Sequence, residues 1–172
     1  MKWEKSTCNW KPFSGWEREH LVFLIDLPEI VKNKIIKTQH NLERFKCFGS
    51  FPKNYLHITV KPWGFINDVK ENSDDLLIGE VFDTVKRIQT NTKSFDIEVH
   101  DLALFPDVVY CKVRDNEKLK SINKELVKIK KINKSWRDGE NFIPHCSIGY
   151  LKEEPSEDFL NYVETNNPVF GK

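Results

Sequence analysis

The stretch YLHITV at residues 55–60 alternates polar and apolar side chains, the pattern of a half-buried β-strand. Successive side chains of a strand point to opposite faces, so His57 and Thr59 share one face. The apolar residues on either side of them share the other face, which is expected to lie in the core. This strand therefore presents an imidazole and a hydroxyl side by side on a polar surface.

The same pattern recurs near the other end of the chain, in the stretch HCSIGYL at residues 145–151. Here His145 and Ser147 share one face of the predicted strand, and Cys146 and Ile148 share the other. The sequence thus holds two copies of a His-x-Thr/Ser motif, each on a strand that keeps an apolar face for the core.

Two histidines and two hydroxyls are sufficient to cleave a phosphodiester. A base must deprotonate the attacking oxygen and an acid must protonate the leaving oxygen; imidazole suits both because its pKa lies near neutrality. Hydroxyls can donate to the non-bridging phosphate oxygens, where charge is stabilised. We therefore expect His57, Thr59, His145 and Ser147 to be catalytic. The alternative stays open at this point, because a lone histidine is more often a structural hydrogen-bonding group.

The other histidines and the cysteines indicate no further chemistry. His20, His40 and His100 are predicted to be surface residues. No Cys, Asp or Glu has a spacing that completes a zinc site with the two motif histidines, and the chain has no P-loop and no GxGxxG. We therefore expect neither a metal nor a cofactor.

The rest of the pattern predicts an α+β fold, with helices covering an antiparallel or mixed sheet. A strand over 21–27 is followed by a helix from Pro28 to Phe45, whose apolar stripe has Thr38 as its polar member. The further elements are a helix over 76–88, strands over 95–99 and 108–113 around a turn at 105–107, a helix over 119–129, a loop over 139–144 and a short helix over 156–163.

Composition is that of one globular domain. The chain has 172 residues, of which 39% are hydrophobic and 31% charged, and its net charge is +1. We expect a single domain at 21–172 behind an N-terminal extension, 1–20, that packs on its surface or forms a flap near the site. No apolar run would span a membrane and no secretory signal is expected. The four widely spread cysteines, Cys8, Cys47, Cys111 and Cys146, could form disulfides, but we expect free thiols, which favour the cytoplasm. We also expect a monomer.

Four blocks of sequence, in this order, resemble the 2H phosphoesterases, most of all the 2'-5' RNA ligase-like and cyclic phosphodiesterase branch. They are FLIDLP at 23–28, LHITVK at 56–61 with Gly64, LALFP at 102–106 and FIPHCS at 142–147. The resemblance implies a bilobal fold in which two antiparallel-rich sheets face a central cleft, with helices outside. It also implies that one of His57 and His145 is the base and the other the acid, and that Thr59 and Ser147 hold the phosphate.

The chain departs from the family's pattern at two places. The family often has an aromatic residue directly after the position of Lys61, where this chain has Pro62 and Trp63. It often has Arg three positions beyond the second hydroxyl, where this chain has Tyr150. We expect Lys61 to contact phosphate, and Trp63 and Tyr150 to stack on a base. The alternatives are a solvated lysine and two rings packed for structure.

The expected function is a metal-independent phosphodiesterase. Its substrate would be a nucleotide or RNA with a cyclic phosphate, or with a 2'-5' or cyclic oligonucleotide linkage. The alternative is a module that binds RNA 3' ends without turnover; it would have no need for two titrating groups. ATP-independent ligation, the reverse chemistry, would be incidental.

Overall fold

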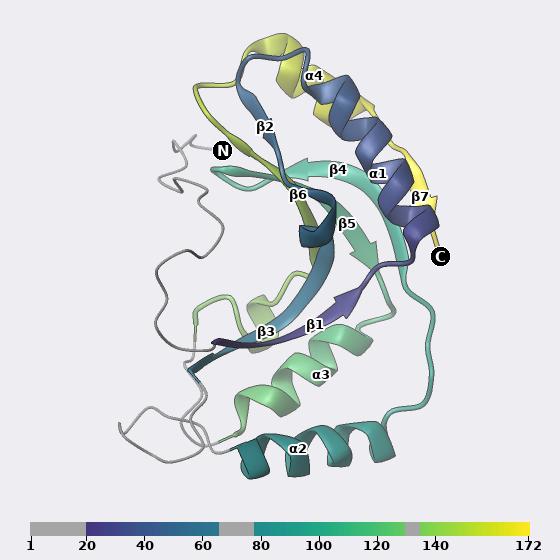
Figure 1. Ribbon diagram of the computed structural model, residues 1–172, viewed down its shortest axis with the longest axis vertical. Helices are drawn as coiled ribbons and strands as arrows, with labels where there is room; N and C mark the ends of the chain where they lie inside the picture. Colours follow the sequence, from purple (N-terminus) through teal and green to yellow (C-terminus); the bar gives the residue numbers. More distant parts are fainter. Residues whose placement is uncertain (1–19, 66–77, 130–134) are drawn as a thin grey trace.

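The computed structural model describes residues 20–65, 78–129 and 135–172 (Figure 1). Its strands are β1 (His20–Asp26), β2 (Phe48–Ser50), β3 (His57–Phe65), β4 (Glu98–Leu104), β5 (Val108–Arg114), β6 (His145–Leu151) and β7 (Val169–Gly171). Its helices are α1 (Glu29–Leu42), α2 (Ile78–Asn91), α3 (Lys118–Val127) and α4 (Glu157–Thr165), with short 3₁₀ turns at Lys53–Tyr55 and Gly139–Asn141. The expected α+β class is confirmed. Apart from His20, the expected extension 1–20 lies outside the described residues.

The strands join one antiparallel network in the order β1-β3-β6-β5-β4-β7, and β2 pairs with β6. Within the described chain, β3 and β6 are joined through a single residue pair, Ile58 with Cys146. This narrow link divides the network into a small part, β1 and β3, and a larger part built on β6. The two sheets that the family resemblance implies correspond to these two parts, which are linked in one network.

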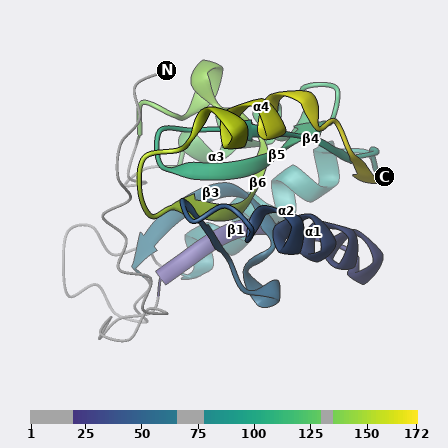
Figure 2. The same ribbon diagram turned by 90° about the horizontal axis from the view of Figure 1, so that it is seen from above.

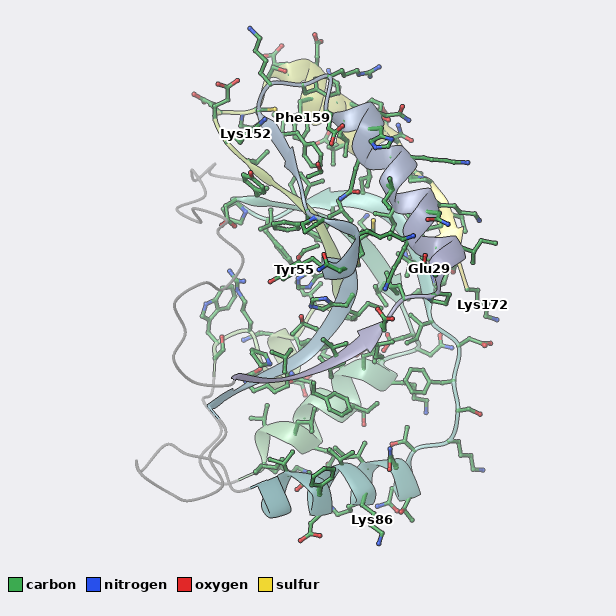
Figure 3. All side chains as sticks on the ribbon, viewed as in Figure 1. Glu29, Tyr55, Lys86, Lys152, Phe159 and Lys172 are labelled. Atoms are coloured by element: carbon green, nitrogen blue, oxygen red, sulfur yellow. The ribbon has the colours of Figure 1, made fainter. Side chains whose placement is uncertain are left out.

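Each part of the network has its own helices. α3 packs on β3 and α2 packs on α3, whereas α1 contacts β6 and β7, and α4 contacts β4 (Figures 1 and 2). Lys86 of α2 projects away from the sheet (Figure 3). No helix among the described residues combines the length and apolarity needed to cross a membrane.

Helix α1 is hydrogen-bonded to the larger part of the strand network through a polar side chain. Its buried face includes Val31, Ile35 and Leu42, as the apolar stripe predicts. The polar members of that face are Lys32 and Gln39, and the prediction of Thr38 is wrong. The Gln39 amide donates to the backbone oxygens of Phe51 and Ile148, each at 2.8 Å. Buried backbone oxygens need such partners, so this contact ties the helix to β6.

Strand β4 begins later than the alternating pattern over 95–99 predicts. Its register with β5 shifts between His100 and Leu102, and Asp101 there adopts a φ of 37°. Such a bulge breaks the period of two. The polar and apolar alternation in the sequence therefore stops at the bulge, although the strand itself continues beyond it. The three-residue strands β2 and β7 were missed because they are too short to show a period.

We expect Gly149→Ala to destabilise the fold. A Cβ atom at Gly149 would lie 2.2 Å from the Phe48 ring and 2.5 Å from the backbone oxygen of Gly49. Overpacking of this kind costs about 1–3 kcal/mol, which urea denaturation measures. Gly79→Ala in α2 is the matched control, because a Cβ there meets nothing within 4 Å. Equal stability of both variants would contradict the close approach of β2 and β6.

Candidate active site

The two histidine motifs lie on neighbouring strands that meet at the Ile58–Cys146 pair. Both of these side chains are 0% exposed and face the core. In an antiparallel register the residues on either side of a pair are also opposite one another. His57 therefore lies across from Ser147, and Thr59 across from His145, on the face away from the core.

All four motif side chains are half-buried, which matches the two faces predicted for each strand. His57 and His145 are diagonal neighbours in this register, and such neighbours are about 7–8 Å apart. Two groups at this separation can each reach one phosphate placed between them through hydrogen bonds of about 3 Å. The register thus brings both imidazoles and both hydroxyls to one patch of the sheet.

The ring of His145 is held by the backbone and by aromatic neighbours. Its Nδ1 lies 2.8 Å from the backbone oxygen of Ile143. A carbonyl oxygen can only accept, so Nδ1 of the neutral ring carries the proton and Nε2 keeps its lone pair. The rings of Phe105 and Tyr110 contact the imidazole edge-on, with centroids 4.9 and 5.4 Å away. Burial lowers the pKa of His145, and nearby Arg137 lowers it further, against the opposing effect of the Ile143 contact.

His57 has a different electrostatic environment. Burial lowers its pKa, but the Asp26 carboxylate opposes this effect. Asp26 is the cross-strand partner of His57 in β1 and forms an ion pair with Lys32 at 2.6 Å. The Tyr55 ring lies 5.1 Å from the imidazole. Of the two histidines, His57 is therefore the one with a carboxylate that favours its charged form.

The cysteine between His145 and Ser147 belongs to the core. Cys146 pairs with Cys111 of β5, and both are fully buried. Burial raises the pKa of Cys146 to about 12, so its thiol stays protonated at neutral pH. We therefore assign it to packing behind the two motifs.

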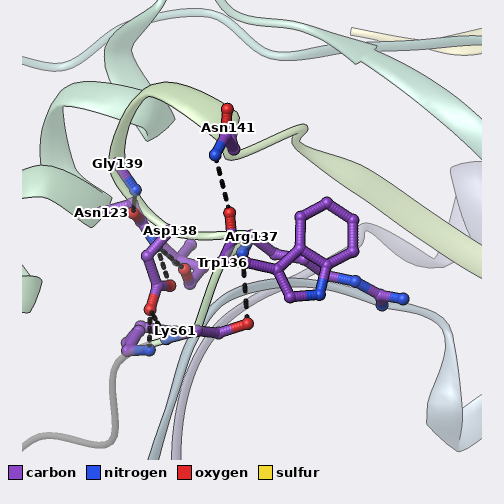
Figure 4. A network of polar contacts seen from close by, with 9 residues as sticks. Lys61, Asn123, Trp136, Arg137, Asp138, Gly139 and Asn141 are labelled. Atoms are coloured by element: carbon purple, nitrogen blue, oxygen red, sulfur yellow. Dashed lines mark hydrogen bonds and ion pairs between the residues drawn. The ribbon is translucent and has the colours of Figure 1, made fainter.

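Lys61 does not share the face of His57 and Thr59. Its side chain is 1% exposed and its ammonium lies 2.6 Å from the Asp138 carboxylate (Figure 4). The reason is a register shift between β1 and β3: Leu24 pairs with Thr59 and Phe23 pairs with Lys61, so Val60 is an extra residue. This bulge inverts the alternation after Thr59, and Lys61 points into the interior.

Of the two aromatic residues expected to stack on a base, only Tyr150 has a described side chain. The Tyr150 ring covers Gly49 and lies 5.7 Å from the ring of Phe51, which favours structural packing. Trp63 belongs to β3, but its side chain lies outside the described residues.

The remaining histidines lie away from the patch or at its margin. His40 is exposed on α1, as predicted. His100 is more buried than predicted: 13% of its side chain is exposed, and its Nδ1 lies 3.2 Å from the Asp101 carboxylate. His20 begins β1, and its side chain is outside the described residues.

Two residues of β5 join the same face and were missed from the sequence. Tyr110 pairs with Ser147, and Lys112 pairs with His145. The alternation over 108–113 was a signal that Tyr110 and Lys112 share a face. Which strand they would lie against could not be inferred from it, because the pairing joins segments more than 30 residues apart.

Across the described chain, no group of three or more His, Cys, Asp or Glu residues is arranged to hold a metal ion.

Comparisons with known proteins relate the chain to one family. The family model described as the 2'-5' RNA ligase superfamily matches residues 32–170. The solved structure of TT0787 of Thermus thermophilus has a TM-score of 0.57 at 17% identity, covering 90% of this chain and 82% of that one. A conserved protein of unknown function from Agrobacterium tumefaciens, ATU0111, gives 0.49 at 13% identity, covering 83% and 66%. No curated protein matches the chain.

Proposed function

Because the chain belongs to the 2'-5' RNA ligase superfamily of 2H phosphoesterases, we propose that it hydrolyses a phosphodiester in a nucleotide or RNA, with no metal. The linkage is a 2',3'-cyclic phosphate, or a 2'-5' or cyclic oligonucleotide bond. The observation that carries this proposal is the Ile58–Cys146 pair, since its register brings His57, Thr59, His145 and Ser147 to one face. The substrate lies against this face, in a cleft between the two parts of the strand network.

We assign the base to His145 and the acid to His57. The Nδ1 proton of His145 is committed to the Ile143 oxygen, which leaves Nε2 to take a proton from water. The resulting hydroxide attacks phosphorus, and the bond from phosphorus to the leaving ribose oxygen breaks. His57, whose charged form Asp26 favours, gives its proton to that oxygen. Thr59 and Ser147 donate hydrogen bonds to the non-bridging oxygens, where negative charge increases.

This assignment predicts a bell-shaped pH dependence of kcat/KM, with both limbs below the ordinary imidazole pKa of about 6.5. The base works neutral, so activity is lost as the pH falls through the lowered pKa of His145. The acid works protonated, so activity is lost as the pH rises through the lowered pKa of His57. Initial rates across the pH range measure both limbs.

The variant Asp26→Asn separates the two roles. It removes the carboxylate that raises the pKa of His57, so the basic limb moves to lower pH and the acidic limb stays. Movement of the acidic limb alone would show that the roles are reversed.

A panel of substrates tests the function itself. Nucleoside 2',3'-cyclic phosphates, 2'-5'-linked oligonucleotides and cyclic oligonucleotides are incubated with the protein in EDTA, and the products are separated. We expect turnover of at least one class with the chelator present. Turnover that stops with EDTA and returns with a divalent metal would disprove the metal-free mechanism. Tight binding of an RNA 3' end without cleavage of any substrate would identify a binding module.

We also propose that the protein acts in the cytoplasm. Three cysteines of the described chain, Cys47, Cys111 and Cys146, are buried free thiols. Thiols persist in reducing compartments, whereas exported proteins tend to form disulfides.

A further inference from the structure

A pocket of about 480 Å³ lies next to the strand residues that carry His145, on the face of the sheet that holds the two motifs. It is lined by residues of β4 and β5, by the turn before α3 and by the two residues that lead into β6; these are His100, Tyr110, Lys112–Glu117, Ile143 and Pro144. Its place follows from the register: His145 pairs with Lys112, and Lys112 pairs with His100. The three side chains form one row across three strands, so the pocket continues the patch that carries the two motifs.

We propose that this pocket is a second subsite, which holds the nucleoside adjoining the reacting phosphate and, through Lys112, the phosphate of the next linkage. The substrate class is then an oligonucleotide of at least two nucleotides, in preference to an isolated cyclic mononucleotide. This inference rests on the proposed function, and it concerns which substrate the same site prefers.

The wall of the pocket suits the face of a nucleobase. Ile143 is 54% exposed, although it is a large apolar residue, and Pro144 lies next to it in the wall of the pocket. Pockets for small organic groups combine an apolar surface with a few polar side chains. The volume lies within the range of about 300–1,000 Å³ that is typical of such pockets.

Of the charged side chains that line the pocket, Lys112 is the one best placed to bind a phosphate. Its side chain is 50% exposed and its ammonium is 3.8 Å from the Asp101 carboxylate, a long ion pair. Arg114 is paired more closely with Glu98, at 2.7 Å. A phosphate at the pocket mouth can therefore attract the Lys112 ammonium at little cost, because the contact it gives up is weak.

The two carboxylates that line the pocket are engaged elsewhere. Asp115 accepts from the backbone N–H of Leu119 in the first turn of α3. Glu117 lies 3.3 Å from the ammonium of Lys120. These contacts reduce the repulsion that an incoming phosphate would meet.

The backbone of the pocket is also unusual. Asn116 and Glu117 adopt left-handed φ angles of 51° and 63°. Such conformations cost free energy in residues other than glycine, and they are often found at ligand sites, where the surrounding structure holds them in place. The strain supports the pocket as a site, and the register supports what it holds.

The experiment compares two substrates that differ by one nucleotide. They are a nucleoside 2',3'-cyclic phosphate and a dinucleotide ending in a 2',3'-cyclic phosphate; a 2'-5'-linked dinucleotide and trinucleotide replace them if that linkage is cleaved. We divide kcat/KM for the longer substrate by kcat/KM for the shorter one. We expect Lys112→Ala to lower this ratio about tenfold, mainly by raising KM for the longer substrate. The loss of one phosphate contact also reduces the slope of log KM against log salt by about 0.7.

Two further variants complete the test. Lys112→Arg keeps the charge and restores the ratio. Lys128→Ala removes an exposed lysine that is paired with Glu125 on α3, and leaves the ratio as in the wild type. Equal losses on both substrates would place Lys112 at the reacting phosphate and overturn the subsite. No loss on either substrate would overturn the subsite as well. A wild type that cleaves no substrate of the panel would instead overturn the proposed function, and the subsite with it.

Discussion

Replacing either His57 or His145 with alanine lowers turnover of the substrate by about 10²–10⁴-fold, the range expected for a lost general acid or base. In the proposed mechanism the two imidazoles, which the register makes diagonal neighbours on one face, act on opposite sides of one phosphate, and each completes a single step. Because they act as a unit, the double variant falls little further than either single one. Thr59→Ala and Ser147→Ala lower turnover less than the histidine variants do, since each removes one hydroxyl contact from the phosphate.

The control for these variants is His40→Ala. His40 is exposed on α1 and is not part of either motif, so its replacement leaves turnover unchanged. Thermal unfolding of each variant separates a catalytic loss from a folding loss. Near-normal turnover by His57→Ala or His145→Ala would refute the paired acid and base, and would favour the binding module.

Replacing Lys61 with alanine lowers the free energy of unfolding by about 3–5 kcal/mol, the cost of leaving one partner of a buried ion pair without the other. The Lys61 ammonium and the Asp138 carboxylate are 1% and 9% exposed and lie 2.6 Å apart. Asp138 also accepts from the backbone of Ser135 at 2.7 Å. Urea denaturation measures the loss.

The pair belongs to a network that joins β3, α3 and the loop before β6 (Figure 4). The Asn123 side chain of α3 donates to the Val60 oxygen and accepts from the N–H of Gly139, each at 2.8 Å. The loop that leads to β6 is thereby tied to β3 and α3. A folded Lys61→Ala protein therefore loses some activity through a displaced loop, although less than either histidine variant.

The pH dependence of stability identifies the carboxylate. Burial tends to raise the pKa of Asp138, but its hydrogen bonds from Lys61 and Ser135 outweigh this effect and lower it. A lowered pKa contributes stability above the unfolded value of about 3.9, and this is lost as the pH falls through the folded value. The difference between wild type and Lys61→Ala therefore shrinks in acid. A Lys61→Ala protein with wild-type stability and no activity would place Lys61 at the phosphate instead.

The sequence by itself determined the local elements and which side chains share a face. The alternation in 55–60 and 145–151 has a period of two, and this period is a property of the extended backbone whatever lies beside it. The half-buried His57, Thr59, His145 and Ser147 follow directly from it. Likewise, the apolar stripe of α1 was visible because a helix has its own period.

Only the tertiary structure decided which strands are neighbours and where the period fails. The Ile58–Cys146 pair joins segments 88 residues apart, and nothing local specifies such a partner. The extra residues at Val60 and Asp101 depend on the partner strands, so Lys61 turned inward against the alternation. The row that adds Lys112 and His100 to His145 arises in the same way, since cross-strand neighbours are set by the register of the whole sheet.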